Sequence, residues 1–216
     1  MKSKAHPDPI AIDGPAASGK SSLGRAIAER LGYHFLDTGL MYRAFALAAM
    51  RHGVPATDEA CETFVRELDL GLGDEAETRV YLGGEDVTGL LHNPEIESQV
   101  SAYAKLEPVR KKMREMQRAF ADRGKAVLAG RDIGEVVLPH APVKFYLEAD
   151  EAARARRRNA ERGIAHEEAA RESHVQLARR DRLDAGQTFL PPDAIVIDTT
   201  ELALAEVIEA AMEHLR

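Results

Sequence analysis

The chain has 216 residues, of which 44% are apolar, and it carries a formal net charge of -7 at pH 7. That size supports one generous domain with a buried core, and the acidic balance argues against a general nucleic-acid binder, which would carry a basic excess. The single cysteine, Cys61, excludes an internal disulfide, and no apolar run approaches the roughly 18 residues of a membrane span. We therefore expect a soluble, cytoplasmic protein with neither a membrane nor a nucleic acid as its partner.

The first predicted element is a buried strand at residues 10–12, and the segment after it fits the phosphate-binding loop pattern G-x-x-x-x-G-K-[ST]. In such a loop the glycines let backbone N–H groups face phosphates, the lysine reaches the β and γ oxygens, and the hydroxyl can ligate Mg²⁺. A helical apolar pattern follows, and its N-terminus adds a positive dipole end. We expect ATP and Mg²⁺ at this loop, with Ser21 on the metal. The predicted ATP-binding residues here are Gly14, Pro15, Ala16, Ala17, Ser18, Gly19, Lys20, Ser21 and Ser22.

Four further apolar runs, at residues 34–36, 126–129, 143–147 and 194–197, are typical of strands, and most precede helix-forming sequence. This alternation predicts an α/β fold, a parallel five-stranded sheet flanked by helices. An interval at about residues 52–124 interrupts this alternation of strand-like and helix-forming sequence. It contains a predicted hairpin turning at Gly83 and Gly84 and a predicted helix around Pro108. Because ligands of open α/β sheets bind outside the carboxyl ends of the strands, we interpret this interval as an insertion that can close over a second substrate.

Two arginines follow the ends of separate predicted strands. Arg43 comes one turn into the helix after the second strand, next to Tyr42, and Arg131 directly follows the third. Guanidinium groups grip phosphate bidentately, so their convergence predicts a second phosphate group. Asp132 has two interpretations that the spacing leaves open, a helix N-cap or a ligand contact. The eight histidines lack metal-ligand spacing, and we assign none of them a catalytic role.

The chain resembles the bacterial cytidylate kinases of the P-loop nucleoside monophosphate kinase group. The resemblance rests on IDGP at 12–15, SGKSS at 18–22, LDTGLMYR at 36–43, GRDIG at 130–134, APVKFYL at 141–147 and AIVIDTT at 194–200. It implies one P-loop kinase chain, 1–216, whose core comprises residues 9–51, 125–150 and 190–216. Residues 52–124 would form an enlarged monophosphate-binding insert, and residues 151–189 would form a short lid.

The resemblance further implies phosphoryl transfer from ATP to CMP or dCMP in pyrimidine nucleotide metabolism, and we expect a monomer. Arg43 and Arg131 would hold the monophosphate, while a second set would read the edge of cytosine: Ser101, Arg110 and Asp132. Thr38 would line the nucleoside site, Asp184 would accept from the ribose, and we assign Tyr42 as substrate-binding. Arginines of the lid region would close over the phosphoryl groups: Arg154, Arg157, Arg158 and Arg180. Of all these residues, we assign Lys20, Arg131, Arg158 and Arg180 as catalytic and Arg157 as ATP-binding.

One departure and two rival functions remain. Gln187 stands where the resembled family usually has an arginine, so we expect Arg158 or Arg180 to supply the missing charge. The first rival is another small-molecule kinase on the same loop, such as a shikimate or gluconate kinase, which the long insertion disfavours. The second is a guanine-nucleotide switch protein, which would carry an N-K-x-D run that this sequence lacks.

Overall fold

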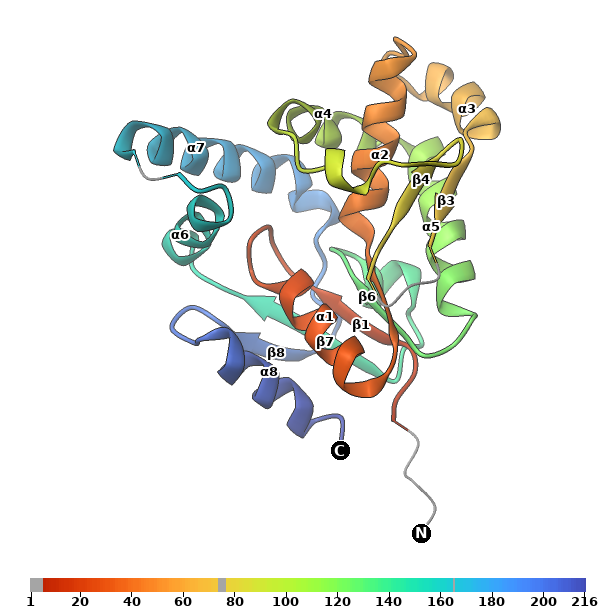
Figure 1. The fold of residues 1–216 in the computed structure, drawn as a ribbon. Helices are drawn as coiled ribbons and strands as arrows, with labels where there is room; N and C mark the ends of the chain where they lie inside the picture. Colours follow the sequence, from red (N-terminus) through yellow and green to blue (C-terminus); the bar gives the residue numbers. More distant parts are fainter. Residues whose placement is uncertain (1–5, 74–76, 165) are drawn as a thin grey trace.

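A parallel sheet of five strands forms the centre of the protein (Figure 1). The computed structural model describes residues 6–73, 77–164 and 166–216, without the side chains of Glu167, Glu168, Glu172 and Arg180. The strand order is β2-β6-β1-β7-β8, and every neighbouring pair is parallel. The predicted fold class and each of the five predicted strands are confirmed, to within one residue at the strand ends. The bounds are β1 (Ile10–Asp13), β2 (His34–Asp37), β6 (Ala126–Ala129), β7 (Val143–Glu148) and β8 (Ile195–Asp198).

Helices cover both faces of this sheet. The helices α1 (Lys20–Leu31) and α8 (Leu204–Glu213) pack on the face that carries Ile10 and Ile12. The helices α2 (Thr38–Arg51) and α5 (Glu107–Ala121) pack on the opposite face with Ala11, because successive strand residues point to opposite sides. Gly24 lets α1 approach closely, since a Cβ there would lie 2.3 Å from the ring of Phe35. The two apolar clusters therefore hold the strand ends in fixed relative positions.

The chain between α2 and α5 forms a smaller substructure beside α2. It contains α3 (Asp58–Glu67), a three-stranded antiparallel sheet, a 3-10 turn η1 (Thr88–Leu90) and α4 (Pro94–Ala104). The strands of this sheet are β3 (Leu70–Leu72), β4 (Val80–Leu82) and β5 (Glu85–Asp86). The predicted hairpin is confirmed: Gly83 and Gly84 turn it with φ angles of 55° and 82°, which glycine adopts readily. The helix predicted around Pro108 is α5, which packs on β6.

After β6 and β7 the chain forms the elements that lie over the carboxyl edge of the sheet. A short π-helical turn, η2 (Ile133–Val137), follows β6, and α6 (Glu151–Glu161) follows β7. Next come α7 (Glu167–Asp184) and the 3-10 turn η3 (Ala185–Gln187). Figure 1 shows α6 and α7 as a pair, and α7 contacts α4 across the molecule. Among the described residues, no helix combines the length and apolar character needed to cross a bilayer.

Candidate active site

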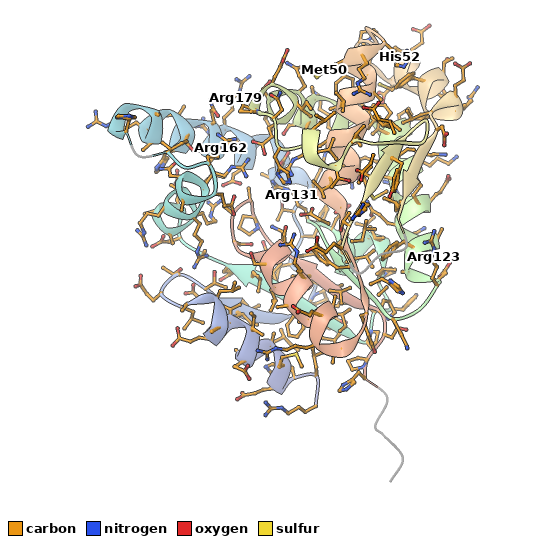
Figure 2. All side chains as sticks on the ribbon, viewed as in Figure 1. Met50, His52, Arg123, Arg131, Arg162 and Arg179 are labelled. Atoms are coloured by element: carbon orange, nitrogen blue, oxygen red, sulfur yellow. The ribbon has the colours of Figure 1, made fainter. Side chains whose placement is uncertain are left out.

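A cavity of about 490 Å³ opens at the carboxyl ends of β1, β2 and β6. Its walls come from the phosphate loop, the start of α2, the end of β6, α4, α5 and the lid region. Figure 2 shows Arg131 between α2 and the C-terminal end of α7. The cavity therefore lies where an open α/β sheet binds its ligands. The predicted site residues that line it are Ala16, Ala17, Gly19, Lys20, Ser21, Ser22, Thr38, Tyr42, Arg43, Arg110, Arg131, Asp132, Arg158 and Asp184.

The loop between β1 and α1 has the backbone geometry that its glycines predict. Gly14 has a φ of 144°, and a Cβ on it would lie 2.3 Å from the carbonyl oxygen of Leu147. Gly19 has a φ of 97° and precedes the first residue of α1, Lys20. Lys20 Nζ donates hydrogen bonds to the oxygen of Pro15 at 2.5 Å and to Ser18 Oγ at 3.5 Å. A helix N-terminus and an ammonium group therefore meet at one end of the cavity, where both attract anions.

Ser21 pairs with a carboxylate that the sequence analysis did not assign. Its hydroxyl donates to Asp37 Oδ2 at 2.6 Å, and Asp37 Oδ1 accepts from the backbone N–H of Gly39 to cap α2. These hard oxygen donors suit Mg²⁺, which protein sites commonly hold by one or two carboxylates together with substrate phosphates and water. The described residues contain no cluster of three or more His, Cys, Asp or Glu side chains able to hold a metal. The donor set thus fits an ion that shares its coordination with phosphate. The signal that could have identified Asp37 is its position at the end of β2.

Arg43 and Arg131 both line the cavity, so the two strand-end arginines reach the same site. Arg131 Nη2 lies 2.8 Å from Asp184 Oδ2, so these two lining residues form an ion pair. Arg43 on α2 is 9% exposed, and its Nη2 lies 3.2 Å from Oε1 of Glu97 on α4. Each guanidinium is therefore held by a carboxylate from another element.

Asp132 contacts Arg110 and does not cap a helix. It precedes η2, but within the described residues its carboxylate makes no capping hydrogen bond, so the N-cap interpretation is wrong. Asp132 Oδ2 instead accepts from Arg110 Nη2, and Arg110 Nη1 donates to Gln187 Oε1 at 2.9 Å. Burial, followed by the negative charge of Asp132, raises the pKa of the nearby Tyr42 to about 12, so its phenol is neutral at pH 7. A carboxylate, a guanidinium, an amide and a phenol thus border one side of the cavity.

Two other predicted substrate contacts have different surroundings. The hydroxyl of Thr38 is buried and donates to the carbonyl of Ala129 at 2.8 Å, which ties the start of α2 to the end of β6. Ser101 is half-buried on α4, and among the described residues it is not one that lines the cavity. Its helical neighbours Val100 and Ala104 line it instead. The structure therefore brings Thr38 to the site and leaves Ser101 outside its lining.

The arginines of the lid region separate into distinct environments. Arg158 lines the cavity, whereas Arg157 donates to Thr199 Oγ1 at 2.9 Å and to the carbonyl of Thr199. Arg154 pairs with Asp181 and donates to the carbonyl of Ala16 at 3.2 Å, so it joins α6 to the phosphate loop. Arg180 belongs to α7, and its side chain lies outside the part of the chain that the structure describes.

A buried carboxylate at the end of β1 connects the phosphate loop to the segment after β6. Asp13 is fully buried and accepts hydrogen bonds from the backbone N–H groups of Ile133 at 2.8 Å and Gly134 at 2.7 Å. Burial raises the pKa of Asp13 from 3.8 to about 6, although both N–H groups act in the opposite direction. Asp13 belongs to the IDGP motif at 12–15, and the sequence alone assigned it no role. We infer from these bonds that it sets the position of Arg131 and Asp132 relative to the loop.

Comparisons with known proteins are consistent with this geometry. The family model described as cytidylate kinase matches residues 10–216. A cytidylate kinase of Symbiobacterium thermophilum is 42% identical over 215 residues, covering 96% of this chain and 95% of its own. One of Geobacillus kaustophilus is 44% identical, covering 94% of each chain. Among solved structures, a gluconokinase from Sinorhizobium meliloti 1021 covers 97% of this chain and 91% of its own, with a TM-score of 0.54 and 18% identity. At that identity the last likeness is one of fold alone.

Proposed function

The chain belongs to the cytidylate kinase family, and we propose that its cavity transfers the terminal phosphoryl group of ATP to CMP or dCMP, giving ADP and CDP or dCDP. The observation that carries the proposal is that one cavity is lined both by the phosphate loop with Lys20 and by the strand-end arginines Arg43 and Arg131. Phosphoryl transfer needs two phosphate groups aligned and their charge neutralised, and this arrangement provides for both.

The donor end consists of the phosphate loop and the start of α1. Backbone N–H groups and Lys20 would bind the β and γ phosphates, and Ser21 with Asp37 would hold Mg²⁺. When bound, Mg²⁺ neutralises charge on the phosphate oxygens. Arg158 and Arg180 would cover the moving group from the lid, and Arg157 remains a proposed ATP contact.

The acceptor end needs positioning and no general base. The attacking atom is a phosphate oxygen that is already ionised near neutral pH, so no side chain has to remove a proton from it. Arg43 and Arg131 would grip the acceptor phosphate, and Asp184, which holds Arg131 at 2.8 Å, would also accept from the ribose. Both arginines are held by carboxylates before substrate arrives, which limits the reorganisation that the reaction requires.

Base selection is proposed for Asp132 and Arg110. The exocyclic amine of cytosine would donate to Asp132, and Arg110 would donate to the ring nitrogen or carbonyl. Uracil would instead present a carbonyl oxygen to the carboxylate. Since Arg110 already bonds to Asp132, the pair is preorganised before the base enters. Ser101 remains part of this proposed set, and it would need to reach the base from beside the cavity wall.

Each segment of the chain from residue 9 onward has a proposed role. Residues 9–51, 125–150 and 190–216 would be the catalytic core, residues 52–124 the monophosphate-binding insert and residues 151–189 the lid. The contact between α4 and α7 supports a lid that works against the insert. A monomer in the cytoplasm completes the proposal, and the buried, single Cys61 suits that reducing compartment.

A coupled assay of ADP release tests the proposal directly. Purified protein receives ATP and Mg²⁺ with CMP, dCMP, UMP, AMP or shikimate, and Lys20→Ala serves as the inactive control. We expect the largest kcat/KM with CMP or dCMP. Faster turnover of AMP or shikimate than of either cytidine nucleotide would overturn the proposed substrate.

A further inference from the structure

The carboxylate of Glu97 lies among three arginines that come from two different parts of the chain. Glu97 belongs to α4, and its side chain is 7% exposed. Its Oε1 pairs with Arg43 of α2 at 3.2 Å. Its Oε2 pairs with Arg158 of α6 and with Arg162, which directly follows that helix. One buried carboxylate therefore bridges the acceptor-phosphate end of the cavity and the lid region.

The position of Glu97 relative to the cavity separates two possible roles. Arg43 and Arg158 line the cavity, whereas Glu97 is not among its lining residues in the described part of the chain. A carboxylate that competed with substrate phosphate would have to face the cavity. Glu97 instead contacts the two arginines from outside that lining, and each of its oxygens pairs with a different one. Glu97 therefore supports the arginines and does not take the place of the phosphate that they would bind.

The charges of the surrounding arginines explain why a carboxylate is favourable at position 97. Three guanidinium groups close together repel one another, and a buried anion between them offsets that repulsion. Burial acts against ionisation of Glu97, but Arg43 and Arg158 outweigh it, so the pKa of Glu97 lies below its ordinary value. Glu97 is consequently charged at neutral pH. The network extends into α7, because Arg162 Nη1 also donates to Gln176 Oε1 at 3.3 Å.

We propose that Glu97 is a positioning residue for phosphoryl transfer, which holds Arg43 and Arg158 in the orientations that bring the acceptor phosphate and the lid together. The inference rests on the proposed function, in which these two arginines contact the reacting phosphates. Glu97 touches no substrate itself. It acts by fixing guanidinium groups on long side chains that have many rotamers, and Glu161 holds Arg158 from a second side at 3.3 Å.

The proposal is tested with Glu97→Gln, which keeps the shape of the side chain and removes its charge. We expect kcat to fall by about 10- to 100-fold, the loss typical of a hydrogen bond to a charged group. The fall should be equal for CMP and UMP, because phosphate is common to both. Glu95→Gln is the matched control, since Glu95 is an exposed residue two positions earlier on the same helix. Its kcat should equal that of the unmodified protein.

Arg158→Ala separates positioning from a general structural role. If Glu97 acts through Arg158, then Glu97→Gln should reduce kcat much less in the Arg158→Ala background than in the unmodified protein. Two outcomes overturn the proposal: a kcat for Glu97→Gln equal to that of Glu95→Gln, or an undiminished fold loss in both the Arg158→Ala and the Arg43→Ala backgrounds. If Glu97→Gln does not fold, Glu97→Asp takes its place, because aspartate keeps the charge but is too short to span both arginines.

The single variants distinguish failure of this inference from failure of the proposed function. If Arg43→Ala and Arg158→Ala leave phosphorylation of CMP unchanged, the proposed roles of the arginines are wrong. If both lower kcat and Glu97→Gln does not, only the role of Glu97 is wrong. A circular-dichroism melting curve for each variant confirms that the measured rates belong to folded protein.

Discussion

Arg110 and Gln187 are joined by a hydrogen bond of 2.9 Å from Nη1 to Oε1, although 77 positions separate them in the chain. The other terminal nitrogen of Arg110 bonds to Asp132. An arginine at position 187 would bring a second cation against Arg110, whereas the amide oxygen of Gln187 accepts a hydrogen bond from it. The residue that departs from the family pattern therefore supports the proposed base-reading pair.

Gln187→Ala should weaken binding of CMP more than it slows transfer. Arg110 would lose one of its hydrogen-bond partners and hold its orientation less firmly, so we expect the KM for CMP to rise about 5- to 10-fold with kcat little changed. Steady-state kinetics with CMP and ATP each varied would measure this. A lower kcat at unchanged KM would place Gln187 at the transferring phosphoryl group instead.

Asp132→Ala should reduce discrimination between cytosine and uracil. The amine of cytosine would lose its acceptor, and we expect the ratio of kcat/KM for CMP to that for UMP to narrow by roughly 5- to 100-fold. Arg43→Ala is the comparison, because it should impair both nucleotides alike through their common phosphate. If the ratio for Asp132→Ala stays at its original value, Asp132 does not read the base.

Replacing an arginine of the lid region with alanine should slow the phosphoryl-transfer step. Arg158 lines the cavity, so Arg158→Ala should lower kcat by about tenfold or more with little change in either KM. Arg180→Ala tests the second expected source of the charge that Gln187 does not supply. Unaltered kcat in both variants would contradict this compensation and direct attention to Arg154, which bonds to the phosphate loop.

Asp13 should make the stability of the fold depend on pH. Its pKa is about 6 in the folded chain and 3.8 ordinarily, so the folded state binds the proton more tightly than the unfolded state. The associated stability is fully present below about pH 4 and is lost as pH rises through about 6, amounting to about 2 to 3 kcal/mol.

Urea unfolding of the unmodified protein and of Asp13→Asn between pH 4 and 7 isolates this contribution. Asp13→Asn lacks the titrating group. As pH increases, the unfolding free energy of the unmodified protein should therefore fall relative to that of Asp13→Asn. A difference that is constant over this range would show that Asp13 titrates alike in both states.

The five strands and the phosphate loop could be predicted because their signals are contiguous. A buried parallel strand is a short apolar run, and the loop needs glycines at positions where the backbone adopts a positive φ, as at Gly14 and Gly19. The hairpin at Gly83 and Gly84 was predictable for the same reason. The helices α3 and α4 begin at local N-cap signals, Thr57 and Asn93, which our sequence-based prediction did not include. Their positions depend on packing against α5 and α2.

The sequence by itself determined where the phosphate loop lies and that Arg43 and Arg131 follow strand ends, since both depend on neighbours in the chain. Only the tertiary structure decided which carboxylate each arginine meets. Glu97 contacts Arg43 and Arg158 because α4 packs against α2 and approaches the lid. Arg157, which remains a proposed ATP contact, bonds to Thr199 in the structure. Ion pairs depend on distances of a few ångström between segments remote in sequence, and those distances are set only when the helices pack on the sheet.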